Sequence, residues 1–303
     1  RIRELDFRAL QGSPGIIDYL HSFAWLRDLS TAATRQQGAP VAEAIMSRWL
    51  EAHAEDVKGV AWRADLWGKR ILFWTAHAPL ILSSRDLVYR SAVLNTLARG
   101  ARHLDRAADK APEGLGKVAA WSGLIAAGLL IPGGEPRRAL AEAGLARALG
   151  TTFSEDGGLI CRSPSALLDA IGLLSLLRAA YDARRETVPP VLDATLARAV
   201  PALLGVCHGD GGLASWQGGL PLDQARIAAT IEASGVRARP LRQARQWGYQ
   251  RLAGGATVVT ADAAPPPASR AASDGCASTL AFEMSDGPHR LVVSCGGARH
   301  PGA

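Results

Sequence analysis

Apolar residues recur at helical spacing along most of the chain, from about residue 16 to residue 250. In the clearest runs they return every third or fourth position, the pattern of a helix that buries one face. This spacing predicts a helical body of about nine or ten helices. Three runs show the pattern best: Trp67, Ile71 and Trp74; Leu167, Ile171, Leu174 and Leu177; and Leu192, Leu196, Val200 and Leu203.

Short segments rich in Gly and Pro are predicted to separate these helices, because both residues interrupt helical structure. Ser163-Pro164 indicates the start of a helix, since Ser is a favourable N-cap and Pro suits the first turn. The predicted breaks are Gly38-Ala39-Pro40, Pro132-Gly133-Gly134, Glu186 to Pro190, and Gly218-Gly219.

The pattern changes after Gly255. Residues 256–262 favour a strand, residues 279–284 alternate with a period of two, and Arg290 to Ser294 follow as the next strand. We therefore predict a mainly α fold with a helical domain at 1–255 and an antiparallel β-sheet domain beginning at 256–303. Three strands make a thin sheet, so either the sheet packs on the helices or the natural chain continues. We favour the second alternative, a truncated β domain.

The charge of the chain is basic but scattered. Among 303 residues there are 34 Lys and Arg against 28 Asp and Glu, a formal net charge of +6. No long block of like charges and no basic run with interleaved aromatic residues occurs, which argues against a nucleic-acid partner. The longest apolar stretch, residues 118–131, is too short to span a membrane.

The sequence also gives little sign of a bound metal or cofactor. The four cysteines form no CxxC pair, and neither an HxxxH nor an HExxH motif is present. Zinc sites and disulfide frameworks usually show such characteristic spacings of Cys and His in the sequence. We expect no metal and no cofactor.

One short sequence occurs twice. Residues 155–159 read Glu-Asp-Gly-Gly-Leu, and residues 209–213 read Gly-Asp-Gly-Gly-Leu. Each copy lies in a predicted loop between helices, and the paired glycines permit a tight turn with positive φ. Asp156 and Asp210 either close their own turns or face a common cleft, because repeated helical hairpins can form a ring whose loops line one face.

Six segments spread over most of the chain carry a family resemblance. They are LHSFAWLRDL (20–29), WSGLIAAGLLIPGG (121–134), EDGGLICRSPSALLDAIGLL (155–174), CHGDGGLASWQGG (207–219), GYQRLAGGATVVTADAAPPP (248–267) and LAFEMSDGPHRLVVSCGG (280–297). In this order they resemble the heparinase II/III-like polysaccharide lyases, particularly a bacterial branch. The resemblance implies an incomplete (α/α) toroid followed by a truncated β-sandwich.

The resemblance also implies β-elimination on an acidic, uronic-acid-containing polysaccharide. That reaction needs a donor that stabilises the enolate, a base for the C5 proton and an acid for the leaving oxygen. In the family these roles typically fall to an Asn, a Tyr and a His. Here Asn95 is the only asparagine, and Leu159 and Cys276-Ala277-Ser278 stand where a His is expected.

Three residues are the candidate catalytic set. Arg162 precedes a predicted helix N-terminus and would bind the substrate carboxylate. His208 and Tyr249 would take the acid and base roles, because imidazole titrates near neutrality and a phenol can transfer a proton. The alternatives are a surface ion pair for Arg162, a structural or solvated His208 and a core Tyr249.

Three further residues are candidates for substrate binding. Asp156 and Asp210 come from the repeated loops, and Trp216 would stack on a sugar ring or else fill the core. Two other functions stay open: a glycoside hydrolase that uses the two aspartates as acid and base, and a non-catalytic glycan-binding or cell-envelope protein. The only partner expected is the acidic polysaccharide. The oligomeric state and the compartment stay open, with the periplasm or envelope expected for a lyase.

Overall fold

The computed structural model describes residues 5–219, 222–268 and 275–295. The chain divides into two compact units. Residues 1–148 and 176–187 make up the first, and residues 149–175 and 188–303 make up the second. The division falls within two helices, α8 and α9, so each of them contributes residues to both units.

The first unit is built from helices joined by short connections. Three short 3₁₀ helices are among these connections: Val60–Trp62, Ala108–Lys110 and Glu135–Arg137. The α-helices are α1 (Pro14–Ser22), α2 (Trp25–Ala32), α3 (Arg35–His53), α4 (Ala64–Ala76), α5 (Ala78–Ile81), α6 (Leu87–Ala107), α7 (Leu115–Leu130) and the parts of α8 (Arg138–Thr152) and α9 (Pro164–Arg184) that belong to this unit.

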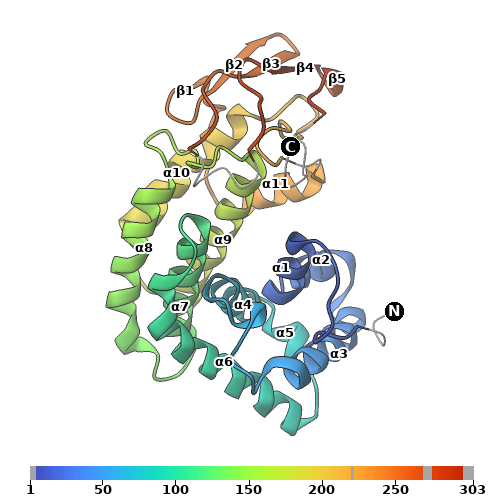
Figure 1. Ribbon diagram of the computed structural model, residues 1–303, viewed down its shortest axis with the longest axis vertical. Coiled ribbons are helices and arrows are strands. Elements are labelled where there is room, and N and C mark those ends of the chain that lie inside the picture. The colour runs from blue at the N-terminus through green and yellow to red at the C-terminus, as the bar shows by residue number, and fades with distance from the viewer. Residues whose placement is uncertain (1–4, 220–221, 269–274, 296–303) are drawn as a thin grey trace. The chain divides into compact units, whose positions relative to one another are not determined.

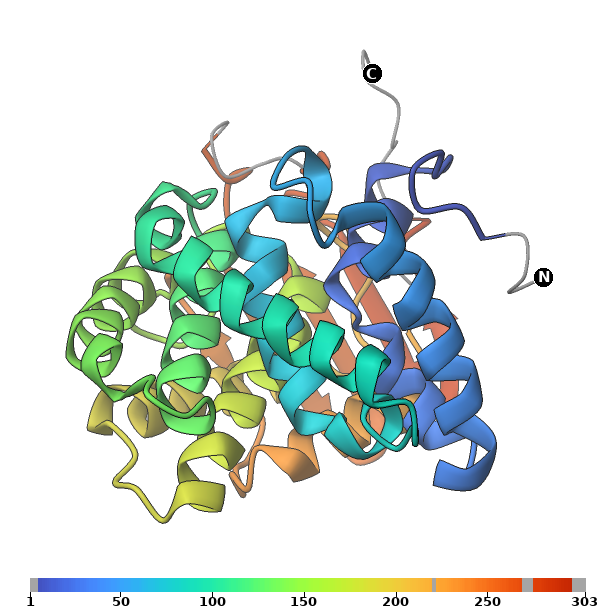
Figure 2. The same ribbon diagram turned by 90° about the horizontal axis from the view of Figure 1, so that it is seen from below.

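Helices α4 and α7 form the centre of the first unit, and α6 packs against both (Figures 1 and 2). Their backbones meet at two glycines: a Cβ on Gly68 would lie 2.0 Å from the Ala119 carbonyl oxygen, and one on Gly123 would lie 2.4 Å from the Gly68 Cα. Any side chain at either position would push the helices apart. The apolar stretch at 118–131 is thus mainly a buried helix, as its length predicted.

A buried arginine joins three segments of the first unit. Arg70 is fully buried, and its guanidinium lies 4.1 Å from the ring centroid of Trp49 and 4.3 Å from that of Trp67. Its N–H groups donate to the carbonyl oxygens of His21 and Ala61. Two indole faces and two carbonyl oxygens therefore stabilise the cation inside the core.

The predicted break at Gly38-Ala39-Pro40 is wrong, because these residues lie inside α3. The helix begins at Arg35, where the Thr34 side chain accepts from the Gln37 N–H and the Gln37 side chain bonds back to Thr34. This capping box fixes the start of the helix three residues before the glycine. The other predicted breaks fall between helices, except that Pro190, the last residue of the break predicted at 186–190, is the first residue of α10. Helix α9 begins at Pro164 as predicted.

The second unit combines helices with a five-stranded antiparallel sheet in the order β1-β2-β3-β4-β5 (Figure 1). The runs predicted for α9 and α10 are buried as expected. Besides its parts of α8 and α9, its elements are α10 (Pro190–Gly205), α11 (Gln224–Ala233), β1 (Gln243–Ala244), β2 (Tyr249–Gly254), β3 (Thr257–Asp262), β4 (Phe282–Asp286) and β5 (His289–Val292).

The described elements confirm a mainly α fold with a small antiparallel β portion. The three predicted strands correspond to β3, β4 and β5. The structure adds β1 and β2, which the sequence had assigned to the helical body, so the sheet begins at Gln243 rather than after Gly255. Since β1 has two residues and β2 ends in glycine, neither carries a clear period of two. The domain boundary at residue 255 stays a prediction.

One face of the sheet is buried and polar. Along β3, Val258, Thr260 and Asp262 are buried and alternate with half-exposed residues, and along β4 the buried residues are Glu283 and Ser285. Except for Val258, these side chains are polar. A buried polar group needs a partner, and the partners come from the loops of the same unit.

Candidate site between two diglycine loops and the sheet

The repeated sequence forms the same turn twice. In the first diglycine loop, residues 153–159, Phe153 and Leu159 pair as an isolated antiparallel bridge and Gly157 has φ +88°. In the second diglycine loop, residues 207–213, the corresponding pair closes the turn in the same way.

The second loop repeats the first in detail. Cys207 pairs with Leu213, Gly211 has φ +80°, and the His208 N–H donates to the Gly212 carbonyl oxygen at 2.9 Å. A positive φ at this position suits glycine. The internal echo in the sequence is therefore a repeated structural motif, and both copies belong to the second unit.

Asp156 of the first loop binds the turn that leads into β2. Its carboxylate accepts hydrogen bonds from the backbone N–H groups of Gln246 at 2.8 Å and Trp247 at 3.1 Å. The Ser154 hydroxyl donates to the same carboxylate at 2.5 Å. Asp156 thus stabilises its own loop and attaches it to the sheet.

Asp210 of the second loop binds β5 instead. The Arg290 guanidinium donates to both carboxylate oxygens, at 2.9 and 3.0 Å, and the Gly212 N–H donates at 2.8 Å. Burial alone would raise the pKa of Asp210, but these hydrogen bonds and the charge of Arg290 hold the pKa below its usual value. A carboxyl with a lowered pKa is a poor proton donor near neutrality.

Arg162 lies in the interior, 5% exposed, with φ +60°. It forms an ion pair with the fully buried Asp262, and its other N–H groups donate to the carbonyl oxygens of Trp247 at 2.8 Å and Pro265 at 2.7 Å. The Ser278 hydroxyl donates to Asp262 at 2.5 Å. Most of the donors that would bind a substrate carboxylate are therefore engaged within the protein.

Tyr249 and Trp216 lie in the same cluster as Arg162. The Tyr249 hydroxyl donates to the Arg162 carbonyl oxygen at 2.7 Å, and the Arg162 guanidinium lies 5.0 Å from the Tyr249 ring centroid. Trp216 is fully buried and stacks on Tyr249 at 5.4 Å. Burial raises the pKa of Tyr249 well above its usual range, which disfavours the phenolate.

His208 belongs to a second cluster on the same sheet face. Its Nε2 lies 3.0 Å from a Glu283 carboxylate oxygen and 3.3 Å from the Thr260 hydroxyl, and its Nδ1 lies 3.3 Å from the Ser285 hydroxyl. The side chains of His208 and Glu283 are both 0% exposed. Arg290 also donates to Glu283, at 3.1 Å.

The structure thus places all six candidate residues where the loops of the second unit meet the sheet. Four of them are buried, and Asp156 and Asp210 are partly exposed. Arg162 and Tyr249 touch each other, whereas His208 contacts β3 at Thr260, two residues before the Asp262 that binds Arg162.

Sequence reasoning missed the buried acids and the arginine that complete these clusters: Asp262, Glu283 and Arg290. The period of two in 279–284 was a usable signal, since it puts Glu283 on the same face as Ser285.

This arrangement attaches loops to a sheet; it does not present an open set of reactive groups. Within the described residues, no three His, Cys, Asp or Glu side chains are grouped so as to hold a metal ion. Likewise, no helix among the described residues combines the length and apolar character needed to cross a membrane.

Comparison with known proteins identifies the fold. Residues 236–302 match the family model for the C-terminal region of heparinase II/III-like proteins. The crystal structure of heparinase III superposes with a TM-score of 0.68 and 12% identity, over 91% of this chain and 50% of that one. A mutant of the heparan sulfate lyase HepC from Pedobacter heparinus gives 0.61 and 15%, over 96% and 51%.

Another similar protein is named for where it is found in the cell and not for an enzymatic activity. The chain is 32% identical over 283 residues to FtsZ-localized protein C of Caulobacter vibrioides, which covers 91% of this chain and 47% of that protein. The chain therefore spans about half the length of the relatives that it matches.

Proposed function

We propose that this chain, which belongs to the heparinase II/III-like family, works as a non-catalytic binding protein on the lyase fold. One observation carries this proposal: the residues that would perform β-elimination are buried and bonded to the protein's own sheet and loops. A buried, bonded side chain contributes to stability and has little freedom to meet a polymer. The ligand that the family suggests is an acidic polysaccharide.

The likeness to an FtsZ-localized protein supports a location for this protein in the cell. We propose that the protein concentrates where FtsZ does, because the similarity extends over 91% of this chain. A fluorescent fusion of the whole protein should overlap with labelled FtsZ in dividing cells. A uniform distribution of a stable fusion would contradict the placement.

Turnover separates a binding protein from a lyase. We expect saturable binding to a uronic-acid polymer with no rise in ultraviolet absorbance, since elimination would leave a conjugated double bond in the product. A steady rise in absorbance that requires the folded protein would overturn the non-catalytic proposal.

The second candidate is a polysaccharide lyase that uses Arg162, His208 and Tyr249, with Asp156, Asp210 and Trp216 near the substrate. The family model and the heparinase III fold favour it.

The variant Tyr249→Phe distinguishes the two candidates. In a lyase it lowers kcat strongly, because the phenol transfers a proton. In a binding protein it removes one buried hydrogen bond and lowers the free energy of unfolding by about 1 kcal/mol, with no turnover to lose.

A glycoside hydrolase would release reducing ends without the absorbance change. The pairing of Asp210 with Arg290 disfavours an acid role for Asp210. The same incubation, assayed for reducing ends, tests that function.

A further inference from the structure

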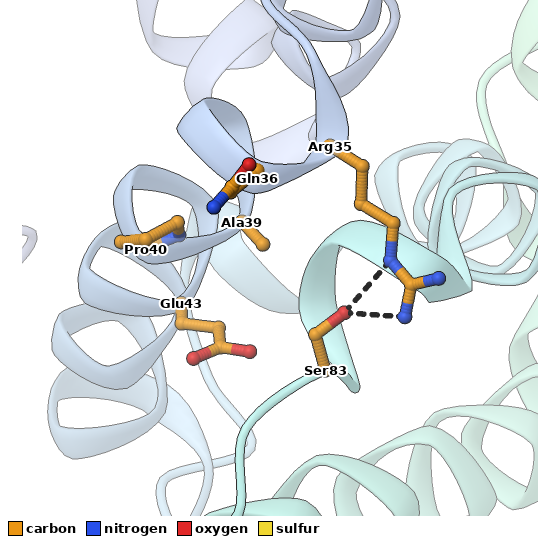
Figure 3. Close-up of a pocket in the computed structure, with 6 residues that line it drawn as sticks. All are labelled: Arg35, Gln36, Ala39, Pro40, Glu43 and Ser83. Atoms are coloured by element: carbon orange, nitrogen blue, oxygen red, sulfur yellow. Dashed lines mark hydrogen bonds between the residues drawn. The ribbon is translucent and has the colours of Figure 1, made fainter.

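The first unit carries a pocket of about 470 Å³ along α3 (Figure 3). This volume is typical of small-molecule sites. None of the residues considered above for β-elimination lines it. It is lined by Arg35, Gln36, Ala39, Pro40 and Glu43 of α3 and by Ser83, which follows α5.

The lining residues of α3 form a row along one side of the helix. Arg35 lies at one end of the row, Ala39 in the middle and Glu43 at the other end, each four residues from the next. Residues at this spacing share a helix face, and eight residues correspond to about 12 Å of helix rise. The pocket therefore has a cationic end and an anionic end, separated by a small apolar floor.

Each charged end has bonding capacity that the described residues leave unused. Arg35 donates to the Ser83 hydroxyl through Nε at 3.2 Å and Nη2 at 3.0 Å, and no described residue accepts from its Nη1. The Glu43 Oε1 atom is buried and has no hydrogen-bond partner among the described residues. A buried carboxylate oxygen without a donor is costly, so a ligand that supplies a donor here would be stabilised.

Pro40 adds a third unused group to the pocket. It lies inside α3 and has no N–H, so it cannot donate to the Gln36 carbonyl oxygen as a residue four positions later in a helix normally does. Gln36 and Pro40 both line the pocket. An acceptor thus lies between the two charged ends, where an amide N–H of a ligand would find it.

We propose that this pocket binds a short peptide by its two free ends. The α-carboxylate pairs with Arg35, the α-ammonium pairs with Glu43, and an internal peptide N–H donates to the Gln36 carbonyl oxygen. Three residues in extended conformation span about 10 Å, which is close to the helix rise of about 12 Å between Arg35 and Glu43.

Simpler ligands fit the pocket less well. The charges of a single amino acid lie much closer together than the helix rise of about 12 Å between Arg35 and Glu43. A plain anion would be repelled by Glu43, and a plain cation by Arg35. The combination of opposite charges at a distance favours a zwitterion of peptide length.

Titration calorimetry of the full chain with trialanine tests the proposal. We expect saturable binding, with a Kd below about 10 mM. Alanine, N-acetyl-trialanine and trialanine amide should bind at least about tenfold more weakly, because each lacks one contact or the length. No saturation with trialanine up to about 10 mM, or equal binding of the blocked peptides, would overturn the proposal.

Matched variants locate the binding. Glu43→Gln and Arg35→Gln should each weaken trialanine binding about tenfold or more. The controls Glu51→Gln on the exposed side of α3 and Arg90→Gln on α6 should change it less than about twofold. Thermal melting confirms that each variant is folded. If the controls weaken binding as much as the pocket variants, the peptide binds elsewhere and the proposal is wrong.

Discussion

The two diglycine loops have the same backbone and hold different partners. Asp156 in the first accepts from two backbone N–H groups before β2, whereas Asp210 in the second accepts from the Arg290 side chain on β5. The residue two positions earlier differs too, since Ser154 bonds within its loop and His208 reaches the sheet. The shared residues fix the turn, and the neighbouring residues decide what the turn holds.

The surroundings of the two loops also differ. A Cβ on Gly157 would lie 2.2 Å from the Arg198 carbonyl oxygen, and one on Gly158 would lie 1.9 Å from the Trp247 ring. At Gly211 a Cβ would meet no atom within 4 Å. The first loop is therefore packed into the unit at both glycines. The second has space at Gly211 alone, since a Cβ on Gly212 would lie 2.5 Å from the Arg290 guanidinium.

The glycines give the largest expected contrast. Gly157→Ala should lower the free energy of unfolding by about 4 kcal/mol, because it adds a backbone clash to a left-handed φ. Gly211→Ala has only the unfavourable φ and should cost about 1 kcal/mol. Urea denaturation of the two variants measures the difference. Equal losses would show that the loops are equally packed.

The aspartates give a smaller contrast. Asp156→Ala leaves two backbone N–H groups without their acceptor and should cost about 2 to 3 kcal/mol. Asp210→Ala should cost about 1 kcal/mol, because Arg290 is partly exposed and keeps Glu283 as a partner. The same denaturation experiment ranks them, and a larger loss for Asp210→Ala would reverse the comparison.

The smallest effect is a pH dependence of the stability that Asp210 contributes. The pKa of Asp210 is lower in the folded protein than its ordinary value of 3.8. The ionised group therefore stabilises the fold above that pH, and the contribution disappears as the pH falls through the folded pKa. The difference in unfolding free energy between wild type and Asp210→Asn, about 1 kcal/mol at pH 6, should shrink below about pH 4. A difference that grows on acidification would contradict this linkage.

Local sequence signals predicted the helices well. Leu167 and Leu196 are buried as their spacing required, and α9 begins at the Ser-Pro signal. The break at Pro40 was wrong because the capping box at Thr34 overrides it. The sequence did not predict β1, because this two-residue strand is recognised by its pairing with β2 and has no alternating pattern of its own.

The candidate site was harder to predict than the fold. The repeat and the family resemblance led to residues that do gather on one interface. Their partners, such as Asp262 and Glu283, lie far away in sequence, and only the pairing of strands brings them to the loops. Whether Arg162 is exposed or buried depends on those distant partners, so the sequence around residue 162 could not predict its burial.

Strand β3 gives this interface a consequence for folding. It offers Thr260 to His208 and Asp262 to Arg162, both from the same side. Sliding β3 by one residue against its neighbours would turn both side chains away, so His208 would lose its contact with Thr260 and Arg162 would lose its charged partner. Two segments that lie far apart in the sequence thus favour the same register of β3, and a chain that pairs β3 out of register loses both contacts.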